Sequence, residues 1–307
     1  MRVRSAALWL ALVPAGLPAQ TPATPAPPAG QNPSPMVEHT RAHTRLPNED
    51  PKGIRRTFNG PMDKPVQVFV PLGTKTNRPL HLVIHFHGAA FIPEIAVSRL
   101  GSPFVSAAVN IAPGSGAYDR AFSDPAVYDS LLASIDRELA AAAGKPVRVN
   151  RVTLVGFSAG HGAIRAILRN QRHFDAVDGV LLLDGLHTSY VPEGTVMEKG
   201  GTLDTTNLVA FTRYARAAMR GDKQFLITHS EIFPGTFAST TETSDYLITA
   251  LGLKRKAVLR WGPGGMQQLS EVRQGQFEVM GFAGNAGPDH IDQFHGMPEF
   301  LRRLERP

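Results

Sequence analysis

The sequence predicts an α/β fold, with a doubly wound, mostly parallel sheet that has helices on both faces. Strand-like apolar segments alternate with segments of helical spacing along the chain, which indicates right-handed βαβ units. Of 307 residues, 42% are apolar, so the chain can bury a sizeable core. A serine also stands between two glycines, Gly156-Phe157-Ser158-Ala159-Gly160, at a predicted strand-to-helix junction.

The predicted elements begin at residue 64. Strand-like segments, some continuing into a turn or loop, cover residues 64–73, 78–94, 102–116, 150–158, 177–186, 223–232 and 256–262. Helical segments cover residues 123–144, 205–221, 243–253 and 297–304, with another helix after residue 160. The helix at 123–144 has the clearest ends, since Ser123 or Asp124 can cap its start and Gly144 lies where a C-cap belongs. Pro and Gly residues between 184 and 223 favour a loop-rich wall, so we expect a small cap or none.

The first 37 residues have the composition of a targeting segment and a linker. Arg2 and Arg4 precede a short apolar run, which predicts a signal peptide at 1–19, with an uncleaved anchor as the alternative. Residues 20–37 are Pro-rich and predict an extended linker, which leaves 38–307 for a single α/β domain. A cleaved signal peptide implies a periplasmic or secreted protein with no stable membrane insertion after cleavage.

Composition excludes several classes of function. The chain has no cysteine, which excludes disulfides, a cysteine nucleophile and thiolate zinc sites. Its formal net charge of +6 is scattered, and no basic run is interleaved with aromatic residues, so we expect no nucleic-acid partner. Neither G-x-G-x-x-G after the first strand nor G-x-x-x-x-G-K-[ST] is present, so we expect no nucleotide and no other cofactor.

The pattern Gly156-x-Ser158-x-Gly160 has the form of a nucleophile elbow. In such a turn the serine adopts a strained backbone conformation, and larger neighbours would clash with the adjoining strand and helix. The strand–turn–helix context that the motif requires is present, so we predict Ser158 as a nucleophile. The alternative is a tight turn that carries a serine without chemistry.

A serine nucleophile needs a base, and two histidines near the C-terminus are candidates. His290 follows a Gly/Pro/Asp loop, and scaffolded loops often carry catalytic groups, so we favour His290. His295 is the alternative and lies closer to the final helix, where a capping or packing role is expected.

Two carboxylates are candidates for the acid that orients the base. Asp184 ends the strand after that of the serine, and Glu231 ends the next strand. Catalytic groups gather at the carboxyl ends of parallel strands, so both positions suit the role. Asp184 follows four apolar residues, and a buried carboxylate is costly unless paired, which favours Asp184 as the partner of an imidazole. A structural turn cap is its alternative role.

The oxyanion hole needs backbone N–H donors, and we expect one at Ala159, directly after the nucleophile. The other is expected in the turn that follows an earlier strand, where Gly88 and Ala89 have small side chains. A metal site is a competing interpretation of this region, because His85 and His87 would share a strand face there. Strand histidines at this spacing are common without metal, so we expect no metal.

From about residue 64 to its end, the chain resembles the α/β-hydrolase superfamily. The segment HFHGAAF resembles the family's oxyanion turn, GFSAG its nucleophile elbow, and DHIDQFHGMPEF its histidine loop. The resemblance implies a Ser–acid–His triad with Ser158 and His290. In the family the acid more often follows the strand that here ends at Glu231, but the usual loop is missing there, which keeps Asp184 first.

Together these features predict an exported serine hydrolase, a carboxylesterase whose substrate is a small-molecule or polymer ester. The alternatives are a catalytically silent α/β-hydrolase-like binding protein and a serine peptidase of the same fold. Nothing in the sequence indicates an oligomeric state.

Overall fold

The computed structural model describes residues 45–305. The predicted signal peptide at 1–19, the linker at 20–37 and the first residues of the predicted domain lie outside this range, so those predictions stand as they were made. Among the described residues, no helix is long and apolar enough to cross a lipid bilayer.

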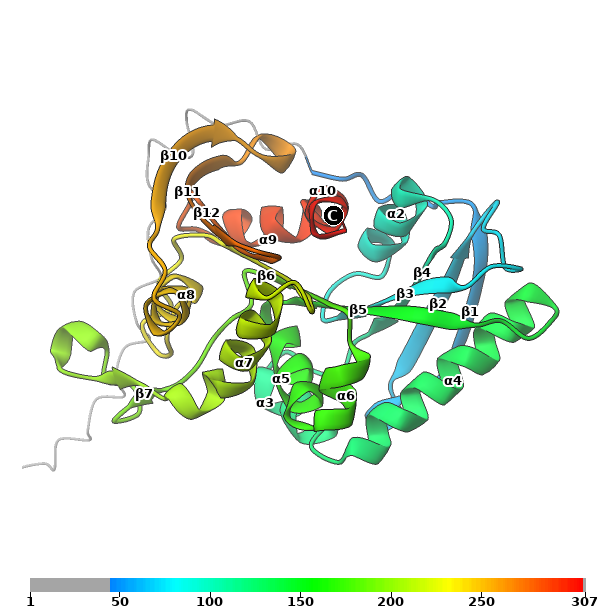
Figure 1. The fold of residues 1–307 in the computed structure, drawn as a ribbon, viewed down its shortest axis with the longest axis horizontal. Helices are drawn as coiled ribbons and strands as arrows, with labels where there is room; N and C mark the ends of the chain where they lie inside the picture. The colour runs from blue at the N-terminus through cyan, green and yellow to red at the C-terminus, as the bar shows by residue number, and fades with distance from the viewer. Residues whose placement is uncertain (1–44, 306–307) are drawn as a thin grey trace, which may run out of the picture. The chain divides into compact units, whose positions relative to one another are not determined.

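One ten-stranded sheet forms the centre of the described domain (Figure 1). The strand order is β1-β2-β4-β3-β5-β6-β9-β12-β11-β10, and the six strands from β4 to β12 are parallel. The strands are β1 (Gly53–Asn59), β2 (Pro65–Pro71), β3 (Leu80–Phe86), β4 (Phe104–Val109), β5 (Val149–Phe157), β6 (Gly179–Leu183), β9 (Gln224–His229), β10 (Lys256–Trp261), β11 (Gln267–Gln274) and β12 (Phe277–Phe282). Strands β3 and β6 are buried along their whole length, as expected for central parallel strands covered on both faces.

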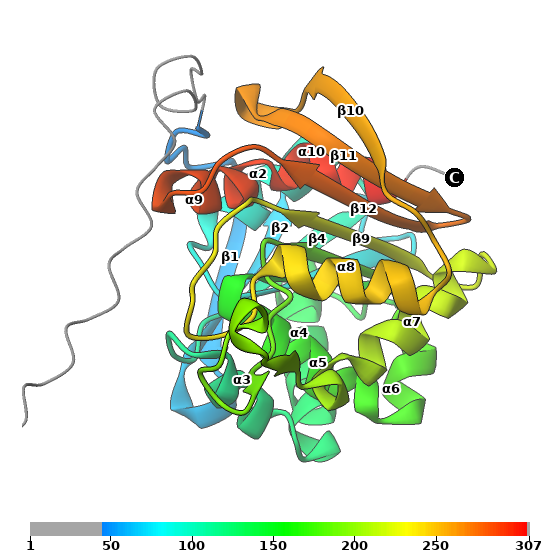
Figure 2. The ribbon, with the colours of Figure 1, turned by 90° about the vertical axis from the view of Figure 1, so that its left-hand side faces the viewer.

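Helices cover both faces of this sheet (Figures 1 and 2). The helices are α2 (Phe91–Leu100), α3 (Ser115–Ala121), α4 (Pro125–Ala143), α5 (His161–Arg169), α6 (Gln171–Ala176), α7 (Val209–Met219), α8 (Thr240–Ala250), α9 (Gly287–His295) and α10 (Met297–Leu304). Apolar residues of α2, α9 and α10 pack in one core on one face, and those of α3 to α8 pack in a larger core on the other. The predicted doubly wound α/β fold is confirmed.

The best-marked helix forms as predicted. Asp124 accepts a hydrogen bond from the N–H of Ala126 at 2.9 Å, Pro125 opens α4, and Gly144 ends it with a φ of 66°. Glycine suits this left-handed C-cap because it has no Cβ to clash there.

Other elements differ from the sequence-based expectation. The segment 256–262 forms β10, an antiparallel edge strand, and the unpredicted strands β11 and β12 follow it. The loop expected around His290 is part of helix α9 instead. Pro288 lies in the first turn of α9, and the Asp289 carboxylate accepts the N–H of Ala286 at 2.9 Å, so the Gly/Pro/Asp sequence starts a helix.

The segment between β6 and α7 forms a small insertion. It contains the two-stranded hairpin of β7 (Tyr190–Val191) and β8 (Thr202–Leu203), followed by a short 3₁₀ helix, Thr205–Leu208. Tyr190 is buried, and its hydroxyl donates to Glu242 of α8 at 2.9 Å, which fastens the hairpin to the domain. This insertion is the small cap that the sequence predicts.

Three histidines of the two cores are almost completely buried. His81 and His85 lie in β3 and His161 begins α5, and burial is the main cause that lowers the pKa of each to about 3. The His85 ring stacks on Phe294 of α9 with a centroid distance of 5.1 Å, and neither of its nitrogens has a hydrogen-bond partner among the described residues.

We expect the free energy of unfolding to fall steeply between pH 7 and pH 5. The three rings are neutral when folded but take up protons below pH 6.5 when unfolded, so stability is greatest above pH 6.5 and is lost as the pH falls toward 3. Each ring contributes about 2 kcal/mol to the loss at pH 5. Guanidinium unfolding at both pH values measures the effect.

The variant His85→Phe is the control, because a phenyl ring preserves the stacking on Phe294 and cannot titrate. Its pH-dependent loss should be smaller by about one histidine's contribution. An unchanged pH dependence would contradict the assignment.

Candidate active site

A cleft of about 520 Å³ opens beside Ser158 at the carboxyl end of the parallel strands. Its lining combines one aromatic side chain with many polar ones: Pro113, Gly114, Ser115, Gly116, Ser158, Ala159, His161, Arg165, His187, Thr188, Ser189, Glu193, Asn207, Thr236 and Phe237. This is the edge of a parallel sheet where ligands usually bind.

Ser158 occupies a sharp turn between β5 and α5, with a φ of 48°. A left-handed φ is unfavourable for serine and requires support from the surrounding backbone. A Cβ on Gly160 would lie 2.1 Å from the carbonyl oxygen of Phe86, and a Cβ on Gly185 would lie 2.7 Å from that of Ser158. The turn therefore requires glycine at positions 160 and 185, because a side chain at either position would clash with a neighbouring backbone carbonyl.

His161 stabilises this turn by a hydrogen bond to its backbone. Its Nδ1 lies 2.8 Å from the carbonyl oxygen of Ser158. A carbonyl only accepts, so Nδ1 carries the proton, and the lowered pKa keeps the ring neutral. The His161 ring thus holds the backbone of Ser158 in place through a hydrogen bond between residues three positions apart.

A partly exposed His290 and a buried Asp184 form a pair beside the residue that precedes Ser158. Nδ1 of His290 donates to Oδ2 of Asp184 at 2.8 Å, and the imidazole lies over the ring of Phe157 at a centroid distance of 4.5 Å. With Nδ1 protonated, Nε2 presents its lone pair, which is the form a general base needs.

Asp184 is held by a second partner that the sequence analysis missed, Ser230. The Ser230 hydroxyl donates to Oδ2 at 2.6 Å, and its N–H donates to Oδ1 at 3.1 Å. Burial by itself raises the pKa of Asp184, but the hydrogen bonds from His290 and Ser230 outweigh it and hold the pKa below its usual value. The carboxylate therefore stays ionised behind the imidazole.

Glu231 and His295 have other contacts. Glu231 is exposed, and its carboxylate accepts the N–H of Gly284 at 3.3 Å. Nδ1 of His295 accepts the N–H of Leu46 at 3.0 Å, which fastens the start of the described chain to α9. Of the two predicted acids and two predicted bases, the structure brings together Asp184 and His290.

The turn after β3 has positive φ values at His87 (74°) and Gly88 (118°). Asn110 bonds to this turn twice, because its side-chain oxygen accepts the N–H of Gly88 at 2.8 Å and its amide donates to the Gly88 carbonyl at 2.9 Å. The N–H of Gly88 is therefore engaged, which corrects its expected role as an oxyanion donor. Ala89, which is exposed, remains the candidate donor of this turn.

The three histidines in and directly after β3, His81, His85 and His87, have separate surroundings. His87 lies beyond the strand with a positive φ, so the alternation of faces ends before it, and its Nδ1 lies 3.1 Å from the Tyr118 hydroxyl. His81 contacts Thr153 at 2.8 Å, and His85 stacks on Phe294. Within residues 45–305, no three His, Asp or Glu side chains are grouped to hold a metal ion.

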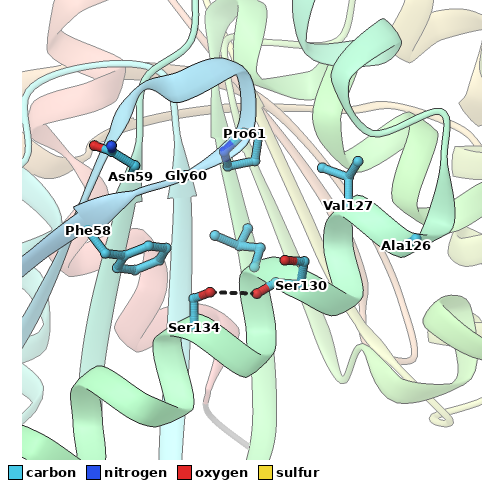
Figure 3. Close-up of a pocket in the computed structure, with 9 residues that line it drawn as sticks. Phe58, Asn59, Gly60, Pro61, Ala126, Val127, Ser130 and Ser134 are labelled. Atoms are coloured by element: carbon cyan, nitrogen blue, oxygen red, sulfur yellow. Dashed lines mark hydrogen bonds between the residues drawn. The ribbon is translucent and has the colours of Figure 1, made fainter.

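A separate hollow of about 310 Å³ lies between β1 and α4 (Figure 3). Its polar side chains are neutral, and the Ser134 hydroxyl donates to the carbonyl of Ser130 at 2.8 Å. The cleft beside Ser158 is the better candidate, since the predicted nucleophile Ser158 and the predicted oxyanion donor Ala159 line it.

Replacing Asp184 by asparagine is expected to lower kcat for ester hydrolysis by about 10⁴-fold. The asparagine amide cannot hold the His290 imidazole in the tautomer that a general base needs. Glu231→Gln is the matched control and should leave kcat/KM within about twofold, since it only touches the N–H of Gly284. Steady-state kinetics of the two variants measures the difference, and equal losses would contradict the assignment of the acid.

Replacing His161 by leucine should lower the free energy of unfolding by about 0.5–1.5 kcal/mol, because the Ser158 carbonyl then loses its side-chain donor and keeps only the backbone N–H of residue 161. His161→Asn has nearly the same size as leucine and keeps an N–H at the Nδ1 position. The asparagine variant should retain more stability and activity than the leucine variant. No difference between them would rule out the hydrogen bond as the cause.

No known protein family matches the chain in sequence, and no curated protein does. Solved structures are similar to it at low identity. A thermostable esterase is 14% identical with a TM-score of 0.45; the similarity covers 83% of this chain and 60% of that one. The feruloyl esterase module of Clostridium thermocellum is 12% identical with a TM-score of 0.46 (87% and 96% covered). A puromycin-hydrolysing peptidase of Mycobacterium tuberculosis is 13% identical with a TM-score of 0.42 (83% and 41% covered).

At these values the similarities do not establish an activity. The chain's own architecture carries the assignment of the fold: six central parallel strands, antiparallel strands at both edges, helices on both faces and a strained serine turn directly after β5. The described chain has the α/β-hydrolase fold.

Proposed function

We propose that the protein is an exported serine hydrolase that cleaves carboxylic esters through an acyl-enzyme. The observation that carries this proposal is the pair of His290 and ionised Asp184 beside the strained turn of Ser158. Export rests on the predicted signal peptide at 1–19, and the proposed location is the periplasm or the extracellular medium.

In the first half of the reaction, Oγ of Ser158 attacks the ester carbonyl while Nε2 of His290 takes the hydroxyl proton. The carbonyl π electrons move onto oxygen, where the N–H groups of Ala159 and Ala89 stabilise the negative charge. Collapse of this intermediate breaks the bond to the alcohol oxygen. His290 returns the proton to that oxygen, and the alcohol leaves.

In the second half, a water molecule attacks the acyl-enzyme as His290 removes its proton. The second tetrahedral intermediate expels Oγ of Ser158, which recovers its proton from His290, and the acid is released. Asp184 remains ionised throughout and stabilises the imidazolium that forms in each half.

Ser158→Ala is expected to lower ester turnover by about 10³-fold or more, because the nucleophile is lost while binding is retained. Release of 4-nitrophenol from 4-nitrophenyl esters measures turnover. Unchanged turnover in the Ser158→Ala variant would contradict the proposed serine hydrolase activity.

Labelling with a fluorophosphonate and mapping the adduct provides an independent test. The adduct should lie on Ser158, and its absence from an intact, folded protein favours a catalytically silent binding protein. Comparing 4-nitrophenyl esters with aminoacyl 4-nitroanilides separates an esterase from a peptidase of the same fold, and we expect the esters to react faster.

A further inference from the structure

The wall of the cleft contains a buried cation, Arg165. This side chain lies on α5, one helical turn beyond His161, and is 9% exposed. Its Nε donates to Oδ2 of Asp119 at 2.6 Å. The described residues provide no acceptor for its two terminal nitrogens, although an arginine has five N–H donors.

The charge around Arg165 is not neutralised locally. Asp119 also accepts a hydrogen bond from Nη1 of Arg169 at 2.9 Å, so two cations share one carboxylate. His161 is neutral at the pH of most cells. Glu193 also lines the cleft but is exposed, where water screens its charge. Arg165 lines the cleft, so an anion bound there can accept hydrogen bonds from its terminal nitrogens.

The position of His290 suggests which part of an ester enters this cleft. His290 must reach the oxygen of the leaving alcohol to protonate it, and it is not among the described residues that line the cleft. The alcohol therefore stays near His290, and the acyl chain extends from Ser158 along α5 toward Arg165.

We propose that Arg165 binds a carboxylate at the far end of the acyl group, so that the preferred substrates are monoesters of dicarboxylic acids. This inference rests on the proposed ester hydrolysis at Ser158. Arg165 lies seven residues after Ser158, roughly 10 Å along the helix axis between backbone positions, and its side chain leans back toward the N-terminus of α5 and so toward Ser158.

The test compares 4-nitrophenyl hydrogen glutarate with 4-nitrophenyl pentanoate, which has the same carbon chain without the charge. The uncatalysed rate is subtracted, because intramolecular attack raises it for the diacid ester. The wild-type protein should prefer the glutarate ester by about tenfold or more in kcat/KM, the usual effect of a hydrogen bond to a charged group.

Arg165→Met removes the charge and keeps the aliphatic stem of the side chain. It should raise KM for the glutarate ester by about tenfold more than it raises KM for the pentanoate ester. Arg169→Met is the matched control, because Arg169 also pairs with Asp119 but does not line the cleft. It should leave the preference unchanged, and Arg165→Lys should restore part of it.

A wild-type ratio near one would overturn the inference, as would equal losses on both esters in the Arg165 and Arg169 variants. If Arg165→Met does not fold, salt decides the question with the wild-type protein. The preference should fall as NaCl rises from about 0.02 to 0.5 M, and a salt-independent ratio overturns the inference. A wild-type protein that hydrolyses neither ester and takes no fluorophosphonate label refutes the proposed function itself.

Discussion

The close approach of backbones around Ser158 is the constraint on which the rest of the site depends. The φ of 48° at this serine persists only because Gly160 lies against the carbonyl of Phe86 and Gly185 lies against Ser158 itself. These contacts join the ends of β3, β5 and β6, the three strands that are followed by Ala89, Ser158 and Asp184. One tight junction thus fixes the three residues proposed as oxyanion donor, nucleophile and acid relative to one another.

The proposed acid, Asp184, is held by a residue of the neighbouring strand's loop. In the family that the motifs resemble, the carboxylate more often follows the strand that here is β9. In this chain Ser230 occupies that region and donates two hydrogen bonds to Asp184, which extends across from β6. The imidazole of His290 thus meets a carboxylate that comes from one strand and is held by hydrogen bonds from the next.

The sequence was sufficient for features that have strong local causes. The alternation of strands and helices, the caps of α4 and the serine turn all follow from residues close in the chain. The contacts of Ser230 and Asn110 were missed, because they join residues 46 and 22 positions apart and carry no motif. Strand β11 gives no strand signal because it is polar along most of its length. Strand β12 is apolar and buried, and pairing between β9 and β11 defines it in the sheet. The Gly/Pro/Asp start of α9 resembles a turn as much as a helix N-terminus, so the sequence favours a loop there.

The first described residues lie against the helix that carries His290. Arg45 donates to Asp292 at 2.7 Å and to the carbonyl of Pro288 at 2.9 Å, while the N–H of Leu46 donates to His295. All three acceptors belong to α9, so this short stretch holds the helix that carries the proposed general base. A recombinant domain trimmed to begin after Leu46 would retain Ser158, Asp184 and His290 and still lose contacts that hold α9. The N-terminal boundary chosen for expression therefore affects the proposed site as well as solubility.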